Sequence, residues 1–337
     1  MIVRCSARTD TGLKRSINQD SYGIVEADDQ GQRGPLLVIC DGMGGHMAGE
    51  VASRLGVETI LADYRETDNH SDPVTFLAQT FVKANQRIYT EGHGTMGTTG
   101  VAALIVGGTL HVANVGDSRA YLVRNRAITQ ISRDHSLIFD QIEAGILTPE
   151  QARHSNMRNI ITRALGYQLE VKVDLFTVAL LPGDVVLLST DGLHNLVTDD
   201  ELAEVVTSMP LDTATAYLID KANERGGPDN ITVVVGCIEP DPVTVGDDDE
   251  DATEPVPVTV LPHPQRYAQP QPFARPRTHE RPLSRLGISL AALLLVTLIA
   301  AGIFTLTTPP LGQDEGVALT PTPQLAVPTV IQPTITP

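Results

Sequence analysis

Residues 36–46 read LLVICDGMGGH, an apolar run that stops at an acid and a glycine-rich turn. The apolar part, residues 36–40, contains β-branched members and is typical of a short buried strand. Asp41 therefore lies where a strand presents its last side chain to a cleft, and the glycines let a ligand or metal approach the main chain closely. Taken alone, the pattern also fits a strand–turn–helix junction in which Asp41 only caps a helix starting near Glu50.

Further acids occupy the same kind of position. Each lies next to an apolar, strand-like segment in a loop rich in glycine: Asp117, Asp191 and Asp229. Asp20 lies close to the start of another such segment. Carboxylates gathered at one edge of a sheet repel one another unless a cation neutralises them. Since no set of His and Cys ligands accompanies them, the metals expected are Mg²⁺ or Mn²⁺.

Such a site predicts hydrolytic chemistry. Two ions about 3.5–4 Å apart can share a water molecule and lower its pKa, which provides a nucleophile. Arg15 lies on the same polar loop as Asp20. Its guanidinium group is suited to holding a phosphate group by paired hydrogen bonds.

The periodicity predicts a mixed α and β domain. Strand patterns, besides residues 36–40, start near Ile2 and Ile24 and cover residues 101–106, 110–115, 120–123, 128–131, 171–176, 185–190 and 231–238. Helical patterns cover residues 50–63, 73–91, 137–144, 199–206 and 213–223. The polar insert at residues 132–165 fits either a flap over a site or a long surface excursion, which costs little loop-closure entropy.

Composition narrows the class of protein. The chain has 337 residues and a formal net charge of −17, which argues against nucleic acid as a partner because phosphate backbones need a basic face. Its three cysteines, Cys5, Cys40 and Cys237, form no CxxC motif, and Cys40 and Cys237, which lie in apolar runs, are expected to be buried thiols in a reducing compartment. No signal-peptide pattern is expected at the N-terminus.

Residues 5–239 resemble the metal-dependent Ser/Thr protein phosphatases of type 2C (the PPM family) in their bacterial form. The resemblance rests on several short segments in family order. They are DTGLKRSINQD at 10–20, DGMGGH at 41–46 with Gly49-Glu50, MGTT at 96–99, VGDSR at 115–119, DHS at 134–136, STDGL at 189–193 and GPDNIT at 227–232.

The resemblance implies a fold and a set of roles. The fold is a four-layer α-β-β-α sandwich of two antiparallel sheets flanked by helices, with residues 136–166 as a flap. Asp41 would bridge two metal ions with the Gly42 carbonyl on one of them, and Asp191 and Asp229 would complete the first metal shell. Asp20 would serve the second ion, Asp117 a third, and Arg15 the substrate phosphate. The implied reaction is in-line attack of metal-activated water on phosphorus, without a covalent phosphoenzyme.

Two departures concern the supporting residues. Eukaryotic members have a Glu–Asp pair where this chain has Gln19-Asp20, and a histidine after the Asp-Gly pair where this chain has Met43. The expected leaving-group acid is therefore missing at that position. His46 either substitutes for it or caps the turn. Asn230, next to Asp229, is a further candidate supporting residue.

The composition changes after residue 240. Residues 241–285 are acidic and then proline-rich, and are expected to form a disordered linker. Residues 286–306 are uncharged and mostly apolar, long enough to cross a bilayer as a single transmembrane helix. Residues 307–337 form a Pro/Thr-rich tail, expected to be unfolded. The phosphatase domain would then be residues 1–240.

Two functions are compatible with these features. The first is a membrane-anchored phosphoserine/phosphothreonine phosphatase, with a monomeric catalytic domain in the cytoplasm acting on phosphoproteins such as Ser/Thr kinases and their substrates. The second is a catalytically dead, membrane-tethered module that holds phosphoproteins. A dead member should have lost at least one acid, and Asp20, Asp41, Asp191 and Asp229 are all present, which favours the enzyme.

Overall fold

The structure is a computed structural model that describes residues 2–27, 33–45, 47–67, 72–148, 151–152, 155, 157, 160–239 and 260–262. The chain divides into two compact units, Met1–Gln265 and Arg266–Pro337. The predicted transmembrane segment 286–306, the tail and most of the predicted linker lie outside the described residues. Within the described ranges, none of the helices is long and apolar enough to cross a membrane.

Two antiparallel sheets form the centre of the first unit. The strands of one sheet run in the order β1 (Ile2–Asp10), β11 (Ile231–Glu239), β10 (Val185–Ser189), β7 (Arg119–Arg124) and β8 (Ala127–Gln130). The other sheet runs β12 (Leu261–Pro262), β9 (Asp174–Ala179), β6 (Thr109–Val115), β5 (Gly100–Val106), β3 (Leu36–Met43) and β2 (Asp20–Val25), and β4 (Gly97–Thr98) pairs with β3. Strand β12 comes from the segment predicted as a linker, so the first unit extends beyond residue 240.

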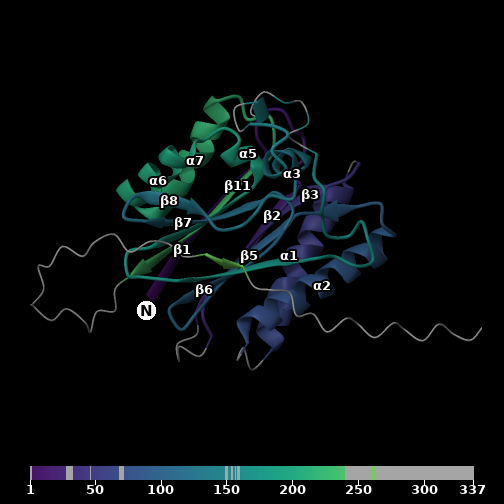
Figure 1. Cartoon of the computed structure of the whole chain (residues 1–337), viewed down its shortest axis with the longest axis horizontal. Helices are drawn as coiled ribbons and strands as arrows, with labels where there is room; N and C mark the ends of the chain where they lie inside the picture. Colours follow the sequence, from purple (N-terminus) through teal and green to yellow (C-terminus); the bar gives the residue numbers. More distant parts are fainter. Residues whose placement is uncertain are drawn as a thin grey trace, which may run out of the picture. The chain divides into compact units, whose positions relative to one another are not determined.

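Helices cover the outer faces of both sheets (Figure 1). The sheet of β3 is covered by α1 (Ala48–Glu66) and α2 (Pro73–Gly92). The sheet of β10 is covered by α5 (Asp191–His194), α6 (Asp199–Ser208) and α7 (Leu211–Glu224).

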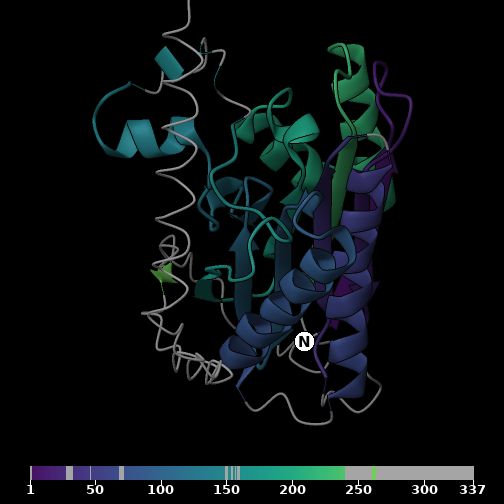
Figure 2. The same cartoon turned by 90° about the vertical axis from the view of Figure 1, so that its right-hand side faces the viewer.

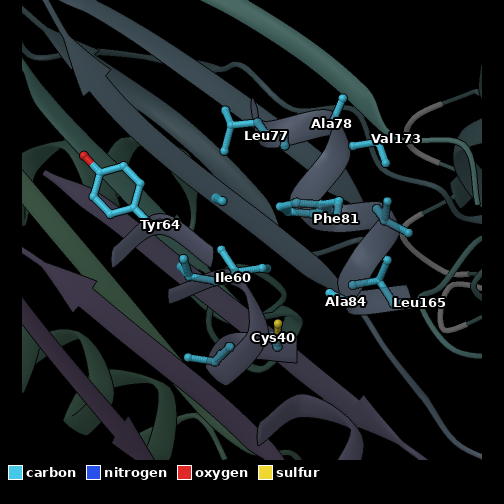
Figure 3. Close-up of a cluster of buried hydrophobic side chains, with 14 of the residues drawn as sticks. Cys40, Ile60, Tyr64, Leu77, Ala78, Phe81, Ala84, Leu165 and Val173 are labelled. Atoms are coloured by element: carbon cyan, nitrogen blue, oxygen red, sulfur yellow. The ribbon is translucent and has the colours of Figure 1, made fainter. Parts of the chain in front are cut away.

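The alternation of side chains along each strand explains this layering. On β3, Leu36, Val38 and Cys40 pack against the helices, as Figure 3 shows for Cys40, whereas Leu37 and Ile39 face the other sheet. Successive strand residues point to opposite faces, and a strand buried on both faces reads as a continuous apolar run. The apolar run read from the sequence is therefore a central strand, and the expected sandwich of two antiparallel sheets with flanking helices is confirmed.

Backbone hydrogen bonds join the two ends of the flap, residues 136–166, at its base. Ser136 and Ile161 form an isolated β-bridge, and the Thr162 amide donates to the His135 carbonyl at 2.8 Å. Between these ends, α3 (Leu137–Glu143) has no fully buried side chain. Figure 2 shows this teal helix standing out from the sheets.

Two local predictions differ from the structure. The strand predicted at residues 171–176 is observed as β9 at Asp174–Ala179, because Val171 and Val173 pack instead into the apolar cluster beneath α2. The turn of helix α5, which begins at Asp191, was not predicted from the sequence. Gly192 lets it form, since a side chain there would collide with the Asn230 carbonyl.

Candidate active site

The first two acids lie side by side on neighbouring strands. Asp20 begins β2, Asp41 lies near the end of β3, and the antiparallel register pairs the two residues directly. The next amide along, that of Gly42, donates to the Gln19 carbonyl at 3.0 Å. A side chain at Gly42 would lie about 2.0 Å from the Gly49 carbonyl oxygen, so this position requires glycine. The strand pairing thus brings two carboxylates together before any ligand is present.

Hydroxyl groups hold the backbone of Asp41. Its amide donates to Thr99 Oγ1 at 2.9 Å, and its carbonyl accepts from Thr98 Oγ1 at 2.8 Å. Thr99 Oγ1 is in turn 2.7 Å from Ser118 Oγ. All three hydroxyl residues are buried, so the main chain of Asp41 is fixed while its side chain remains available.

Asp20 is buried and only half satisfied. Its Oδ2 accepts hydrogen bonds from Thr190 Oγ1 at 2.9 Å and Thr232 Oγ1 at 2.6 Å. Its Oδ1 is buried and has no partner among the described residues. Burial, with the charges of Asp191 and Asp229 adding to it, raises the pKa of Asp20 to about 7. An unsatisfied buried carboxylate oxygen costs free energy unless a ligand meets it.

Asp117 follows a turn at Gly116 that the side chain of His135 holds in place by a hydrogen bond. The Gly116 amide donates to His135 Nδ1 at 3.0 Å, so the other ring nitrogen, Nε2, carries the proton and donates to Asp174 Oδ2 at 3.1 Å. Burial, reinforced by the charges of Asp191 and Asp134, raises the pKa of Asp117 to about 8. Asp134 itself is engaged by Arg119 through both carboxylate oxygens.

The last two acids are partly exposed: Asp191 begins helix α5, and Asp229 lies in the loop before β11. Asp191 Oδ2 accepts from Asn195 Nδ2 at 3.2 Å. Asp229 Oδ2 accepts from Arg15 Nη2 at 2.8 Å, and this ion pair raises the pKa of Arg15 above its ordinary value. The predicted phosphate-binding arginine therefore lies beside a predicted metal ligand.

Asn230 organises the loop that carries Arg15. Its Oδ1 accepts from the Gln19 amide at 2.8 Å, and its Nδ2 donates to the carbonyls of Thr11 at 2.8 Å and Ile17 at 3.0 Å. Gly12 has a positive φ of 76°, and a side chain there would lie about 2.1 Å from the Asp229 carbonyl oxygen. The loop consequently packs directly against the segment that supplies Asp229.

The five carboxylates act on one another around Asp41. Burial raises the pKa of Asp41 well above its ordinary value, and the charges of Asp20, Asp191, Asp117 and Asp229 add to the effect. No three His, Cys, Asp or Glu side chains within the described residues are grouped closely enough to form a metal site as they stand. The donor set nevertheless fits a hard divalent cation, because all the side-chain donors are carboxylates, one buried oxygen lacks a partner, and the cluster gains from added positive charge.

The structure therefore brings together all five predicted acids and Arg15, and gives Asn230 a supporting role. His46 lies outside the described residues. Sequence reasoning assigned no role to Thr99, Thr190 or Thr232, although each lies in a matched motif segment. A hydroxyl residue beside a motif acid is the signal that could have identified them.

Comparisons with known proteins identify the class to which this two-sheet sandwich and its carboxylate cluster belong. The family model "Protein phosphatase 2C" matches residues 16–143. The serine/threonine phosphatase stp of Listeria monocytogenes serotype 4b (strain F2365) is 38% identical over 237 residues, 68% of this chain and 93% of that protein.

Solved structures agree with this result. The serine/threonine phosphatase of S. agalactiae superposes with a TM-score of 0.66 at 38% identity, covering 70% of this chain and 100% of that one. The catalytic domain of the serine threonine protein phosphatase PstP, solved with two manganese ions, gives a TM-score of 0.63 at 34% identity, covering 71% and 99%. This chain belongs to the protein phosphatase 2C family in its bacterial form, and it is a protein serine/threonine phosphatase.

The carboxylate cluster predicts an unusual pH dependence of stability in metal-free protein. Asp20 and Asp117 titrate near pH 7 and 8 when folded but near their ordinary values when unfolded, so the folded state binds more protons between these limits. Their contribution to stability is complete below about pH 4 and is lost as pH rises through 7 to 8. Urea unfolding after chelation should give a lower unfolding free energy at pH 8 than at pH 5.

Asp20→Asn should make this profile shallower, because the amide is neutral at every pH while Asp117 still titrates. Asp220→Asn, an exposed carboxylate on α7, serves as the matched control and should keep the wild-type slope. An unfolding free energy that rises from pH 5 to pH 8 in the wild type would contradict the assigned electrostatics.

Proposed function

We propose that this phosphatase hydrolyses phosphoserine and phosphothreonine in proteins with two Mn²⁺ or Mg²⁺ ions held by the carboxylate cluster. The observation that carries the proposal is the buried, unpartnered Oδ1 of Asp20 inside a group of acids that raise one another's pKa. The residues assigned to the metals are Asp20, Asp41, the carbonyl of Gly42, Asp191 and Asp229, with Asp117 for a third ion.

The chemistry that such ions supply when bound is a water nucleophile of lowered pKa. The protein's own contribution is to hold the ligands in place. Paired strands fix Asp20 against Asp41, and the hydroxyls of Thr190 and Thr232 leave one Asp20 oxygen free to bind. Ligands held in this way need little rearrangement when charge develops in the transition state.

Arg15 is assigned to the substrate phosphate. Its side chain is half exposed and its position beside Asp229 places the guanidinium at the edge of the cluster. Arginine presents several N–H groups in a planar fork, so it can keep one contact to Asp229 and offer others to a phosphate. This arrangement would orient the phosphoryl group over the carboxylates.

We also propose that the enzyme is anchored in the membrane with its catalytic domain in the cytoplasm, where it opposes Ser/Thr kinases. The support is in the sequence: residues 286–306 are uncharged and mostly apolar, five arginines lie between residues 266 and 285, and residues 307–337 contain no Lys or Arg. Positively charged flanks near a span stay in the cytoplasm. The linker would act as a tether that raises the local concentration of enzyme near membrane-bound phosphoproteins.

Removing a metal-binding carboxylate should abolish most of the activity. Asp191→Asn and Asp229→Asn should each reduce kcat with Mn²⁺ on a phosphothreonine peptide by orders of magnitude, because each substitution removes one negative charge from the proposed metal ligands. The circular dichroism spectrum of each variant should stay unchanged. Asp220→Asn is the control for loss of a surface charge. Near-normal kcat in both site variants at saturating Mn²⁺ would rule out the two-metal mechanism.

Removing the guanidinium group of Arg15 should mainly weaken the binding of the phosphopeptide substrate. Arg15→Ala should raise KM for a phosphopeptide about tenfold or more, since a charge-assisted contact is worth about 1.5–3 kcal/mol. Lys14→Ala, an exposed cation on the same loop, controls for general electrostatic attraction. If KM and kcat of Arg15→Ala both equal those of the wild type, Arg15 does not contact the substrate.

The membrane orientation can be tested with epitope tags at both ends and protease treatment of spheroplasts. The N-terminal tag should be protected and the C-terminal tag removed. The reverse pattern, or a protein that is extracted without detergent, would refute the anchored arrangement.

A further inference from the structure

A cavity of about 740 Å³ adjoins the carboxylate cluster, between the flap helix α3 and the segment that joins α5 to α6. Asp117 and Asp191 line it on the side of the cluster, and Asp199 and Asp200, the first residues of α6, line it as well. Its volume is in the range of sites that take small ligands or side chains. A substrate whose phosphate reaches the cluster therefore has its neighbouring residues at this cavity.

The walls of the cavity are partly apolar. Ile138 and Ile142 lie one helical turn apart on α3, and Leu196 and Val197 also contribute. Both isoleucines remain only half-buried, and α3 as a whole has no fully buried side chain. The apolar face of this helix thus lacks the packing that usually stabilises a short helix.

The charge of the cavity is negative. Arg119 is the only Lys or Arg among its described lining residues, and its guanidinium is taken up by both oxygens of Asp134. Asp117 is only 7% exposed, and within the described residues the structure gives its carboxylate no hydrogen bond beyond its own backbone amide and no ion pair. Asp199 and Asp200 consequently give the cavity exposed negative charge that no lysine or arginine among its described lining residues matches, whereas the buried Asp117 belongs to the carboxylate cluster.

Asp199 and Asp200 are not needed to build α6. That helix already begins with a capping box, in which Thr198 and Glu201 satisfy each other's backbone amides. Glu201 is also paired with Lys221 and Arg225. Asp199 and Asp200, by contrast, are exposed and form no ion pair in the part of the chain that the structure describes. Their remaining interaction with the α6 dipole is weak, because the effect is small at a solvent-exposed helix end and is screened by salt.

We propose that this cavity binds a lysine or arginine side chain of the substrate, a few residues from the phosphorylated Ser or Thr. The inference rests on the proposed function, since the phosphate must first occupy the carboxylate cluster. A long basic side chain matches the cavity in both respects: its aliphatic stem packs between Ile138, Ile142 and Leu196, and its cationic head reaches Asp199 and Asp200. The cavity thus selects phosphopeptides by charge.

The test measures kcat/KM of the full chain in detergent, with Mn²⁺, on phosphothreonine peptides that carry Lys, norleucine or Glu at each of the flanking positions. At one or two positions, Lys should exceed Glu by about five- to tenfold, as expected for one cation facing two partly solvated acids. Hydrolysis of p-nitrophenyl phosphate, which has no flanking residues, is measured in parallel.

Three variants identify the source of the preference. Asp199→Asn/Asp200→Asn should bring the Lys-to-Glu ratio close to one, and Asp199→Lys/Asp200→Lys should reverse it, a gain that a damaged fold could not give. The control Glu204→Gln/Asp220→Asn removes two exposed carboxylates from α6 and α7 that do not line the cavity, and should keep the wild-type ratio. The ratio between peptides is the readout, so differences in overall activity do not enter.

The outcomes separate the two proposals. Absence of p-nitrophenyl phosphate hydrolysis with Mn²⁺ would refute the proposed function itself. Hydrolysis without any preference, or a preference that survives the charge reversal at Asp199 and Asp200, would overturn the assignment of the cavity alone. Inhibition of the wild type by the isolated, unphosphorylated peptide of residues 266–285, lost on charge reversal, would assign the cavity to the chain's own arginine-rich segment and also overturn it.

Discussion

Repulsion among carboxylates is the constraint on which the site depends. Burial raises the pKa of Asp41 well above its ordinary value, and the charges of four other acids add to the effect. In this low-dielectric setting, taking up protons or binding a cation costs these acids less free energy than remaining charged without a partner. The fold forces them together nonetheless, because the β2–β3 register places Asp20 opposite Asp41 and β10 delivers Asp191 to the same end. Such a cluster is stable only when bound protons or a metal cation neutralise its negative charge.

The surrounding hydrogen bonds have one common effect, which is to fix the acids while leaving oxygens open. Thr190 and Thr232 occupy one oxygen of Asp20 and leave the other without a partner. Thr98 and Thr99 bind only the backbone of Asp41. Neutral hydroxyls are suited to this purpose, since a nearby lysine or arginine would cancel the charge that a metal ion needs. Arg15 lies at the partly exposed edge of the cluster, and Arg119, whose charge acts on Asp117, is held by Asp134.

Hydrogen bonds connect the base of the flap to the segment that carries Asp117. The Gly116 amide, next to Asp117 in the sequence, donates a hydrogen bond to His135. The Asp174 carboxylate accepts hydrogen bonds from His135 and from Arg163, which lies at the far end of the flap. The position of the flap base is therefore tied to that of an acid in the cluster. Ser136, Ile138 and Ile142 line the cavity together with Asp117 and Asp191, so the segment that the sequence left as either a flap or a surface excursion forms a wall beside the acids.

The sequence alone was sufficient for the strand ends and their acids. A strand buried on both faces needs a continuous apolar run, and three such runs lead into Asp41, Asp117 and Asp191, so these acids could be found from local pattern. The start of β9, the α5 turn, the bonds of Thr190 and Thr232 to Asp20, and the bonding partners of Asn230, which the sequence named only as a supporting residue, could not be found in this way. Each depends on partners far along the chain: Thr232 and Asp20 are 212 residues apart. Local sequence specifies which side chains a strand carries, but which hydroxyl meets which carboxylate is decided only when separate strands pair, because a hydrogen bond depends on distance in space.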